Sequence, residues 1–207
     1  MNLRLPQGQR ILILVSSLWL IGPLLLPQQP AMAQQQFSVK PIAEKKIKEL
    51  PAGPLYWRIE TFPALAQAKA AEGPTSPSAE AGGKAWLFTL GPKGGSTPGA
   101  TKVAEIGPVP PVNAPEYLLR INSGSAPPGA KTPVHTHPGS ETFYVLSGQL
   151  SQKTPQGVMH VDAGQAMLGH VSGTPMEVSS SGTGDLNALV MFLVDASKPF
   201  SSPAKFE

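Results

Sequence analysis

The chain has 207 residues, with 16 lysines and arginines against 13 aspartates and glutamates, and a net charge of +3 at pH 7. This near balance, without a long basic run, argues against a nucleic-acid partner. The absence of cysteine excludes disulfides, thiolate metal sites and a lipidated cysteine anchor.

The first 33 residues have the pattern of a secretory signal peptide. Arg4 and Arg10 precede an apolar run from Ile11 to Leu26, and Ala31-Met32-Ala33 supplies the small residues of a cleavage site. A membrane anchor needs about 20 apolar residues, whereas this run is shorter and is interrupted by serines, a glycine and a proline. We therefore expect an exported chain, periplasmic or secreted, that is not embedded in a membrane after cleavage.

Residues 34–84 are predicted to form an N-terminal extension ahead of the main domain. Pro41–Leu50 has apolar residues at helical spacing and predicts a short amphipathic helix. Leu55–Phe62 predicts a strand, and the alanine-rich Pro63–Glu72 predicts a second short helix. The composition of Gly73–Gly83 is typical of a flexible loop.

Residues 85–196 are predicted to form one all-β domain, followed by a C-terminal tail over 197–207. The 21 glycines and 24 prolines of the chain separate short apolar runs, which favours many strands joined by tight turns. The last run, Asn187–Val194, is continuously apolar and predicts a strand buried on both faces. The sequence shows no internal repeat, so a single jelly-roll β-barrel fits best. The predicted strands are Ala85–Leu90, Thr101–Ile106, Glu116–Asn122, Glu141–Ser147, Val158–Asp162, Gln165–Leu168, Met176–Ser179 and Asn187–Val194.

The stretch from Gly129 to Gly148 contains a candidate metal site. His135 and His137 are two residues apart, so in a strand their side chains point to the same face. Pro138 and Gly139, which lie between His137 and Glu141, turn or bulge the chain and can bring Glu141 beside the two imidazoles. Two histidines and one carboxylate leave coordination positions open, an arrangement that suits Fe(II), Mn(II) and similar ions.

The spacing in this stretch is Gly, five residues, His-x-His, three residues, Glu, six residues, Gly, and it resembles the first signature motif of the cupin superfamily. The resemblance covers about residues 115 to 195. It implies a cupin barrel that binds a divalent metal ion (Fe, Mn, Zn or Cu) through His135, His137 and Glu141. It also implies a small-molecule ligand or substrate, and homodimers are common in the superfamily.

The superfamily includes both enzymes and binding modules, so the resemblance leaves the function open. One alternative is a metal-dependent enzyme of oxygenase or isomerase type that acts on a small oxygenated substrate. The other is a non-catalytic module that binds a small ligand or a metal.

The second cupin motif is degenerate. Gly164 begins it, and Gly173 and Pro175 set a register in which Met176 stands where the family has its last metal-binding histidine. Three interpretations remain: Met176 is a thioether ligand that favours copper, Met176 only fills the core beside a three-ligand site, or His170 replaces the missing imidazole.

Other side chains are assigned by strand alternation. Phe143 and Val145 share the parity of Glu141 and are expected to line the pocket. Arg120 either binds an anionic substrate in the pocket or is an exposed charge at a sheet edge. His160 is expected at the surface or behind the metal ligands, and it is not counted as a site residue.

Overall fold

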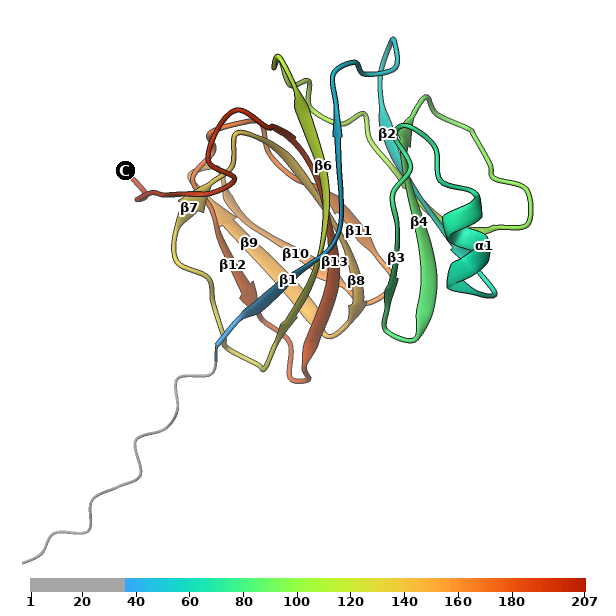
Figure 1. Cartoon of the computed structure of the whole chain (residues 1–207). Coiled ribbons are helices and arrows are strands. Elements are labelled where there is room, and N and C mark those ends of the chain that lie inside the picture. Colours follow the sequence, from blue (N-terminus) through green and yellow to red (C-terminus); the bar gives the residue numbers. More distant parts are fainter. Residues whose placement is uncertain (1–35) are drawn as a thin grey trace, which may run out of the picture. The chain divides into compact units, whose positions relative to one another are not determined.

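The computed structural model describes residues 36–207, which are nearly all β-structure with one short helix (Figure 1). The predicted signal peptide over residues 1–33 lies outside the described residues. No helix within residues 36–207 has the length and apolar character needed to cross a membrane. The elements are β1 (Ser38–Ile47), β2 (Tyr56–Phe62), α1 (Leu65–Ala70), β3 (Ser78–Ala81), β4 (Lys84–Gly91), β5 (Thr101–Ile106), β6 (Tyr117–Ala126), β7 (His135–Thr136), β8 (Gly139–Ser147), β9 (Gln149–Thr154), β10 (Gly157–Asp162), β11 (Ala166–Leu168), β12 (Glu177–Ser180), β13 (Leu186–Asp195) and β14 (Ser202–Pro203).

The barrel consists of a five-stranded sheet in the order β1-β6-β13-β8-β11 and a three-stranded sheet in the order β10-β9-β12. All pairings within these sheets are antiparallel. Apolar side chains from both sheets meet in one core cluster, which includes Phe143 of β8, Leu150 of β9 and Val190 of β13. The prediction of an all-β jelly-roll barrel is therefore confirmed.

A further sheet, of four strands in the order β3-β4-β2-β5, packs against the five-stranded sheet. Its tryptophans, Trp57 and Trp86, share a core cluster with Ile121 of β6 and Leu189 of β13. Strand β13 thus contributes alternate side chains to two cores, which explains its continuously apolar sequence. The helix α1 packs on β3 and β4 through the buried Ala68 (Figure 1).

The predicted boundary between residues 84 and 85 does not separate two sheets. Strands β4 and β5, predicted as barrel strands, pair with β2 from the predicted extension. The division into an N-terminal extension over residues 34–84 and a barrel domain over residues 85–196 stays a prediction.

The prediction of a helix over Pro41–Leu50 is wrong, because β1 occupies most of this segment and pairs with β6 along its whole length. Ile42 and Ile47 still pack on the apolar core, as a helix of this sequence would have required. The backbone gains a complete ladder from β6, and the register shift near Pro41 accommodates a residue that cannot donate to that ladder. Tertiary pairing overrides a weak local preference here.

The prediction of a flexible loop over Gly73–Gly83 is also wrong in part. Strand β3 lies within it and pairs with β4. The strand begins at Ser78, whose backbone N–H and hydroxyl both donate to Glu72 Oε1 at 2.9 and 2.6 Å. A carboxylate six residues away therefore orders a segment that looks featureless by composition.

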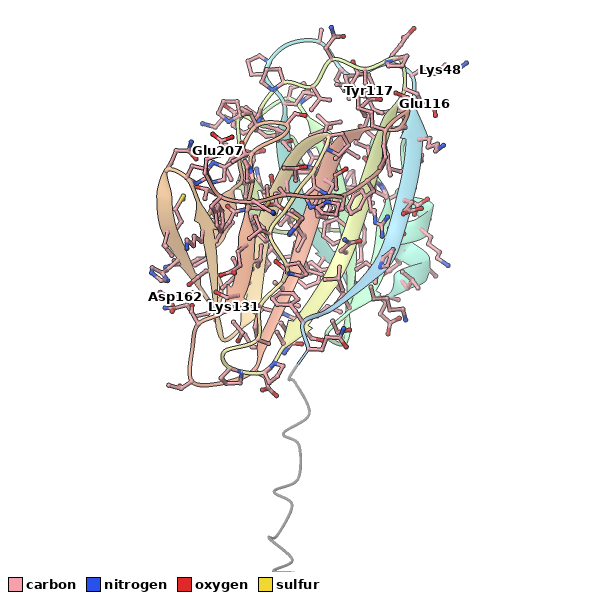
Figure 2. All side chains as sticks on the ribbon, turned by 90° about the vertical axis from the view of Figure 1, so that its left-hand side faces the viewer. Lys48, Glu116, Tyr117, Lys131, Asp162 and Glu207 are labelled. Carbon is pink, nitrogen blue, oxygen red and sulfur yellow. The ribbon has the colours of Figure 1, made fainter. Side chains whose placement is uncertain are left out.

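Several charged side chains lie near the two ends of the barrel. Figure 2 shows Lys48 and Glu116 at one end of β1 and β6, and Lys131 and Asp162 toward the opposite end. The largest buried side chains are apolar, with the sheet interiors formed by aromatic, leucine, isoleucine and valine residues. This arrangement leaves the few polar groups inside the barrel conspicuous.

The two glycines that frame the histidine motif differ in what they make possible. Gly148 has a φ of +73°, and a Cβ atom there would lie 2.8 Å from the backbone oxygen of Asp185. Gly129 has a φ of +82° but no heavy atom within 4 Å of the Cβ position. The two sites therefore share backbone strain and differ in steric room.

We expect Gly148→Ala to lower the free energy of unfolding by about 2–5 kcal/mol, because left-handed strain and overpacking add. The matched variant Gly129→Ala should cost only about 1–2 kcal/mol, from strain alone. Urea unfolding of both variants measures the difference. Equal losses would show that the close approach to Asp185 does not contribute.

Candidate metal centre and ligand pocket

A cavity of about 410 Å³ lies inside the barrel, between its two sheets. Nineteen residues line it; twelve are apolar, and none is a lysine or an arginine. Its ionisable lining residues are His135, His137 and Glu141. The structure therefore brings together, at one cavity, the three side chains that the motif predicts as metal ligands.

His135 is held by backbone pairing on two sides. Its N–H and C=O bond to the backbone of Met176 at 3.0 and 2.9 Å, and β14 pairs with β7 at Pro203. Its imidazole Nδ1 lies 2.8 Å from the carbonyl oxygen of Pro133. Because a carbonyl only accepts, this contact selects the neutral tautomer with the proton on Nδ1, in which Nε2 carries the lone pair.

His137 is held by the C-terminal segment. Its Nδ1 donates to the carbonyl oxygen of Phe200 at 2.7 Å, and its ring packs on Phe192 and Phe200 with centroid distances of 4.8 Å. Burial lowers the pKa of His137 to about 4, against the opposing effect of the Phe200 carbonyl. The imidazole is therefore neutral at pH 7, and its Nε2 lone pair is free.

Glu141 lies at the buried end of the cavity with only 3% of its surface exposed. Its Oε2 lies 3.9 Å from His137 Nε2, and its Oε1 accepts a hydrogen bond from Gln152 Nε2. Burial raises the pKa of Glu141 to about 8, although the bond from Gln152 opposes this shift. With both groups neutral near pH 7, this contact is not an ion pair. A nearby cation would favour the carboxylate form.

The donor set fits a divalent ion. Nitrogen and oxygen ligands lie about 2.1 Å from such an ion, so two of them can be at most about 4.2 Å apart. The distance of 3.9 Å between His137 Nε2 and Glu141 Oε2 is within this limit. The centroids of the His135 and His137 rings are 5.0 Å apart. Among residues 36–207, however, no three histidine, aspartate or glutamate side chains already converge as a metal-binding group. The chemistry of the ligands therefore fits, while full convergence would need their side chains to close further.

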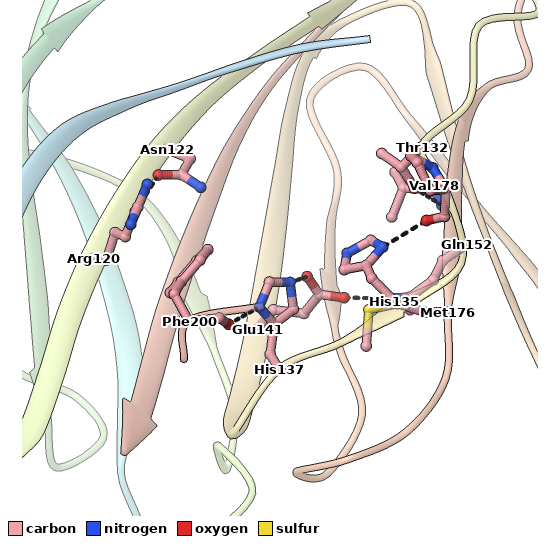
Figure 3. A network of polar contacts seen from close by, with 11 residues as sticks. Arg120, Asn122, Thr132, His135, His137, Glu141, Gln152, Met176, Val178 and Phe200 are labelled. Atoms are coloured by element: carbon pink, nitrogen blue, oxygen red, sulfur yellow. Dashed lines mark hydrogen bonds and ion pairs between the residues drawn. The ribbon is translucent and has the colours of Figure 1, made fainter. Parts of the chain in front are cut away.

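Met176 lies opposite His135 in an antiparallel bridge. Its side chain is 2% exposed, and its sulfur accepts a hydrogen bond from Gln152 Nε2 at 3.4 Å. It does not line the cavity. Figure 3 shows Met176 and Gln152 together on one side of Glu141, with His137 on the other. A ligand role and a core-filling role for Met176 both stay open.

His170 does not line the cavity either. Its Nε2 is buried and has no hydrogen-bond partner among the described residues, and burial lowers its pKa. Its proposed replacement of the missing histidine stays a prediction.

Arg120 does not line the cavity, and it is not an exposed charge at a sheet edge either, because β6 lies between β1 and β13 and the side chain is only 20% exposed. Its guanidinium lies 4.1 Å from the centre of the Phe200 ring and pairs with Glu44 at 3.2 Å. Its Nε donates to Asn122 Oδ1 at 2.9 Å (Figure 3). Arg120 therefore packs against the ring of Phe200, which lines the cavity.

The remaining assignments by strand alternation are mostly confirmed. Phe143 lines the cavity, whereas Val145 is buried in the same core without reaching it. His160 is exposed, and its Nδ1 is hydrogen-bonded to Ser151 Oγ at 2.6 Å. It lies outside the cavity, as expected.

Sequence reasoning missed Gln152 and Phe200, which orient the candidate ligands. Gln152 shares strand parity with the apolar Leu150, so a polar residue on the inward face was a readable signal. Phe200 lies in the predicted tail, 63 residues from the histidine that it binds. No local pattern marks it.

Comparison with known proteins supports the fold. The family model described as "Cupin domain" matches residues 124–192, a segment that includes His135, His137, Glu141 and Met176. No curated protein matches the sequence.

Among solved structures, the chain is similar to a cupin-like protein from Thermotoga maritima, with 13% identity over 42% of this chain and 65% of that chain, and a TM-score of 0.38. It is also similar to the polyketide cyclase RemF from Streptomyces resistomycificus, with 19% identity over 43% and 62% of the two chains and a TM-score of 0.36. The DMSP lyase DddQ from Ruegeria pomeroyi matches with 21% identity over 42% and 43% of the chains and a TM-score of 0.36. The matched segments thus span less than two thirds of each of these proteins. The strand topology, the complete histidine motif and the family match lead to one conclusion: residues 124–192 of this chain belong to a cupin domain.

Proposed function

We propose that this cupin binds one divalent metal ion through His135, His137 and Glu141 and holds a small molecule in the adjoining cavity. One observation carries the proposal: both imidazoles are anchored through Nδ1 to backbone carbonyls, which leaves two Nε2 lone pairs beside a buried carboxyl group. Such outer hydrogen bonds orient metal-binding histidines and increase their basicity. Met176 would add a soft thioether ligand if the ion were copper.

A metal-dependent enzyme is the second candidate, favoured because the three ligands face a cavity that could admit a substrate. A bound ion would supply Lewis-acid or redox chemistry there. The other polar lining residues, Asn122, Thr132 and Ser201, can hydrogen-bond a substrate but have no pKa suited to general acid–base catalysis. We therefore place ligand binding ahead of turnover.

The first 33 residues support export as a further part of the proposal, since they have the three regions of a signal peptide. Assembly into a homodimer stays a prediction.

The metal proposal is tested by calorimetric titration of chelator-treated protein with Zn²⁺, Mn²⁺ and Cu²⁺. We expect one ion per chain, and at least about 100-fold weaker binding by His135→Ala, because one of three protein ligands is lost. His160→Ala is the matched control and should bind as the wild type does. Equal affinity of the wild type and His135→Ala, or no binding above background, would contradict the proposal.

A further inference from the structure

We propose that the ligand of the cavity is a compact apolar molecule with a single oxygen-bearing head group. Sugars and phosphate esters are excluded from this class. The inference rests on the proposed function only for the position of the head group, beside His135, His137 and Glu141. The apolar part rests on the cavity walls alone.

The walls favour an apolar body. Phe143 of β8, Leu150 of β9 and Val190 of β13 line the interior from both sheets of the barrel. The volume of about 410 Å³ is toward the lower end of small-molecule sites, which span about 300–1,000 Å³. A flat or rounded hydrophobic molecule of modest size would bury most of its surface here.

The more exposed part of the lining is largely apolar as well. Phe37 and the half-exposed Val39 line the cavity from the N-terminal side, and Phe200 and Pro203 line it from the C-terminal segment, beside the exposed Ser201. A ligand therefore meets apolar side chains at entry as well as inside.

Hydrogen-bonding capacity beyond the His–Glu cluster is small. Asn122 Oδ1 already accepts from Arg120 Nε at 2.9 Å, and Thr132 Oγ1 accepts from the backbone N–H of Val178 at 3.0 Å. Beyond the cluster, the side-chain donors that line the cavity are the amide N–H groups of Asn122 and the hydroxyls of Thr132 and Ser201. A sugar would bury several hydroxyl groups without partners, and unpaired buried hydroxyls strongly oppose binding.

The charges around the cavity oppose phosphate esters. Its lining contains no lysine or arginine, and Arg120 lies behind the Phe200 ring and is paired with Glu44. A divalent ion whose charge is partly offset by the Glu141 carboxylate could not neutralise a dianion. A phosphate ester would therefore lose its hydration without sufficient compensation.

The class is tested by calorimetric titration of the wild-type protein with three probes of similar size: 1-naphthol, D-glucose and phenyl phosphate. Each is measured with EDTA and again with excess Zn²⁺. We expect 1-naphthol to bind at least about tenfold more tightly than either polar probe under both conditions. Tighter or equal binding of D-glucose or phenyl phosphate would overturn the inference.

Three variants locate the binding. Ala188 is buried and lines the cavity, so Ala188→Leu should fill it and weaken 1-naphthol binding at least about tenfold. Val39 and Val158 are exposed to 50% and 52%, but only Val39 lines the cavity. Val39→Ser should weaken 1-naphthol about two- to fivefold, whereas Val158→Ser should have no effect. Both valines are exposed, so this pair remains informative if Ala188→Leu does not fold.

Equal weakening by Val39→Ser and Val158→Ser would show that the probe adheres to exposed apolar surface, and it would overturn the inference. The metal proposal and the ligand class can be contradicted independently of each other. If 1-naphthol binds and responds to Val39→Ser while no ion binds, the ligand class stands without the metal. If an ion binds and 1-naphthol does not, the ligand class is wrong.

Discussion

Glu141→Gln is expected to abolish the thermal stabilisation that a divalent ion gives to the wild-type chain. An ion at 100 times its dissociation constant stabilises the folded state by about 2.7 kcal/mol. For a chain of this size, this corresponds to a rise in Tm of about 5–10 °C. The amide cannot supply the carboxylate charge, so the variant should show a rise of less than about 2 °C. Calorimetric or fluorescence melting with EDTA and with saturating metal measures both values.

In EDTA, the same variant should be at least as stable as the wild type. Glu141 is almost fully buried, and Gln152 is the one side chain that donates a hydrogen bond to it among the described residues. Replacing it by a neutral amide of equal size removes an ionisable group from the core at little steric cost. A buried ionisable group that lowers the stability of the fold is expected at a functional site.

Glu177→Gln is the matched control. Glu177 lies on β12 outside the cavity and pairs with the exposed Lys131 at 3.1 Å. Surface pairs of this kind contribute little, so its metal-dependent rise in Tm should equal that of the wild type. The metal site would be misplaced if Glu141→Gln kept the full rise, or if Glu177→Gln lost it.

Deletion of residues 199–207 is expected to weaken metal binding by about 10–100-fold. The deletion removes the Phe200 carbonyl that holds His137 Nδ1 at 2.7 Å and the ring that packs on this imidazole. It also removes β14, which pairs with the short strand carrying His135. Loss of outer hydrogen bonds to metal-binding histidines has effects of this size. Metal titration of the shortened protein measures the loss.

Deletion of residues 204–207 alone is the control, because it keeps Phe200 and β14. The backbone bond from Ala204 to Val134 is lost, so a change of up to about threefold in metal affinity is expected. If the short deletion weakened binding as much as the long one, the effect would come from the chain end rather than from Phe200. Unchanged binding by the long deletion would show that the C-terminal segment does not hold His137 in a productive orientation.

The local features of this protein follow from the order of its residues alone. Strand alternation put His135, His137 and Phe143 on the inward face, and all three line the cavity. The continuous apolar run of β13 predicted burial on both faces, and the two core clusters show it. These features depend on spacing between residues close together in the chain, which the order of residues specifies directly.

The contacts that distant segments make with these strands come from the folded chain and not from any local pattern. Pro41–Leu50 has a helical pattern but forms β1, because its backbone pairs with β6, about 80 residues along the chain. Gln152 and Phe200 orient Glu141 and His137 from strand β9 and from the C-terminal segment. Such contacts form because barrel closure places distant segments side by side, and a long-range pairing leaves no periodic signal in the sequence. The motif therefore identifies the candidate ligands, whereas the fold supplies the groups that hold them in place.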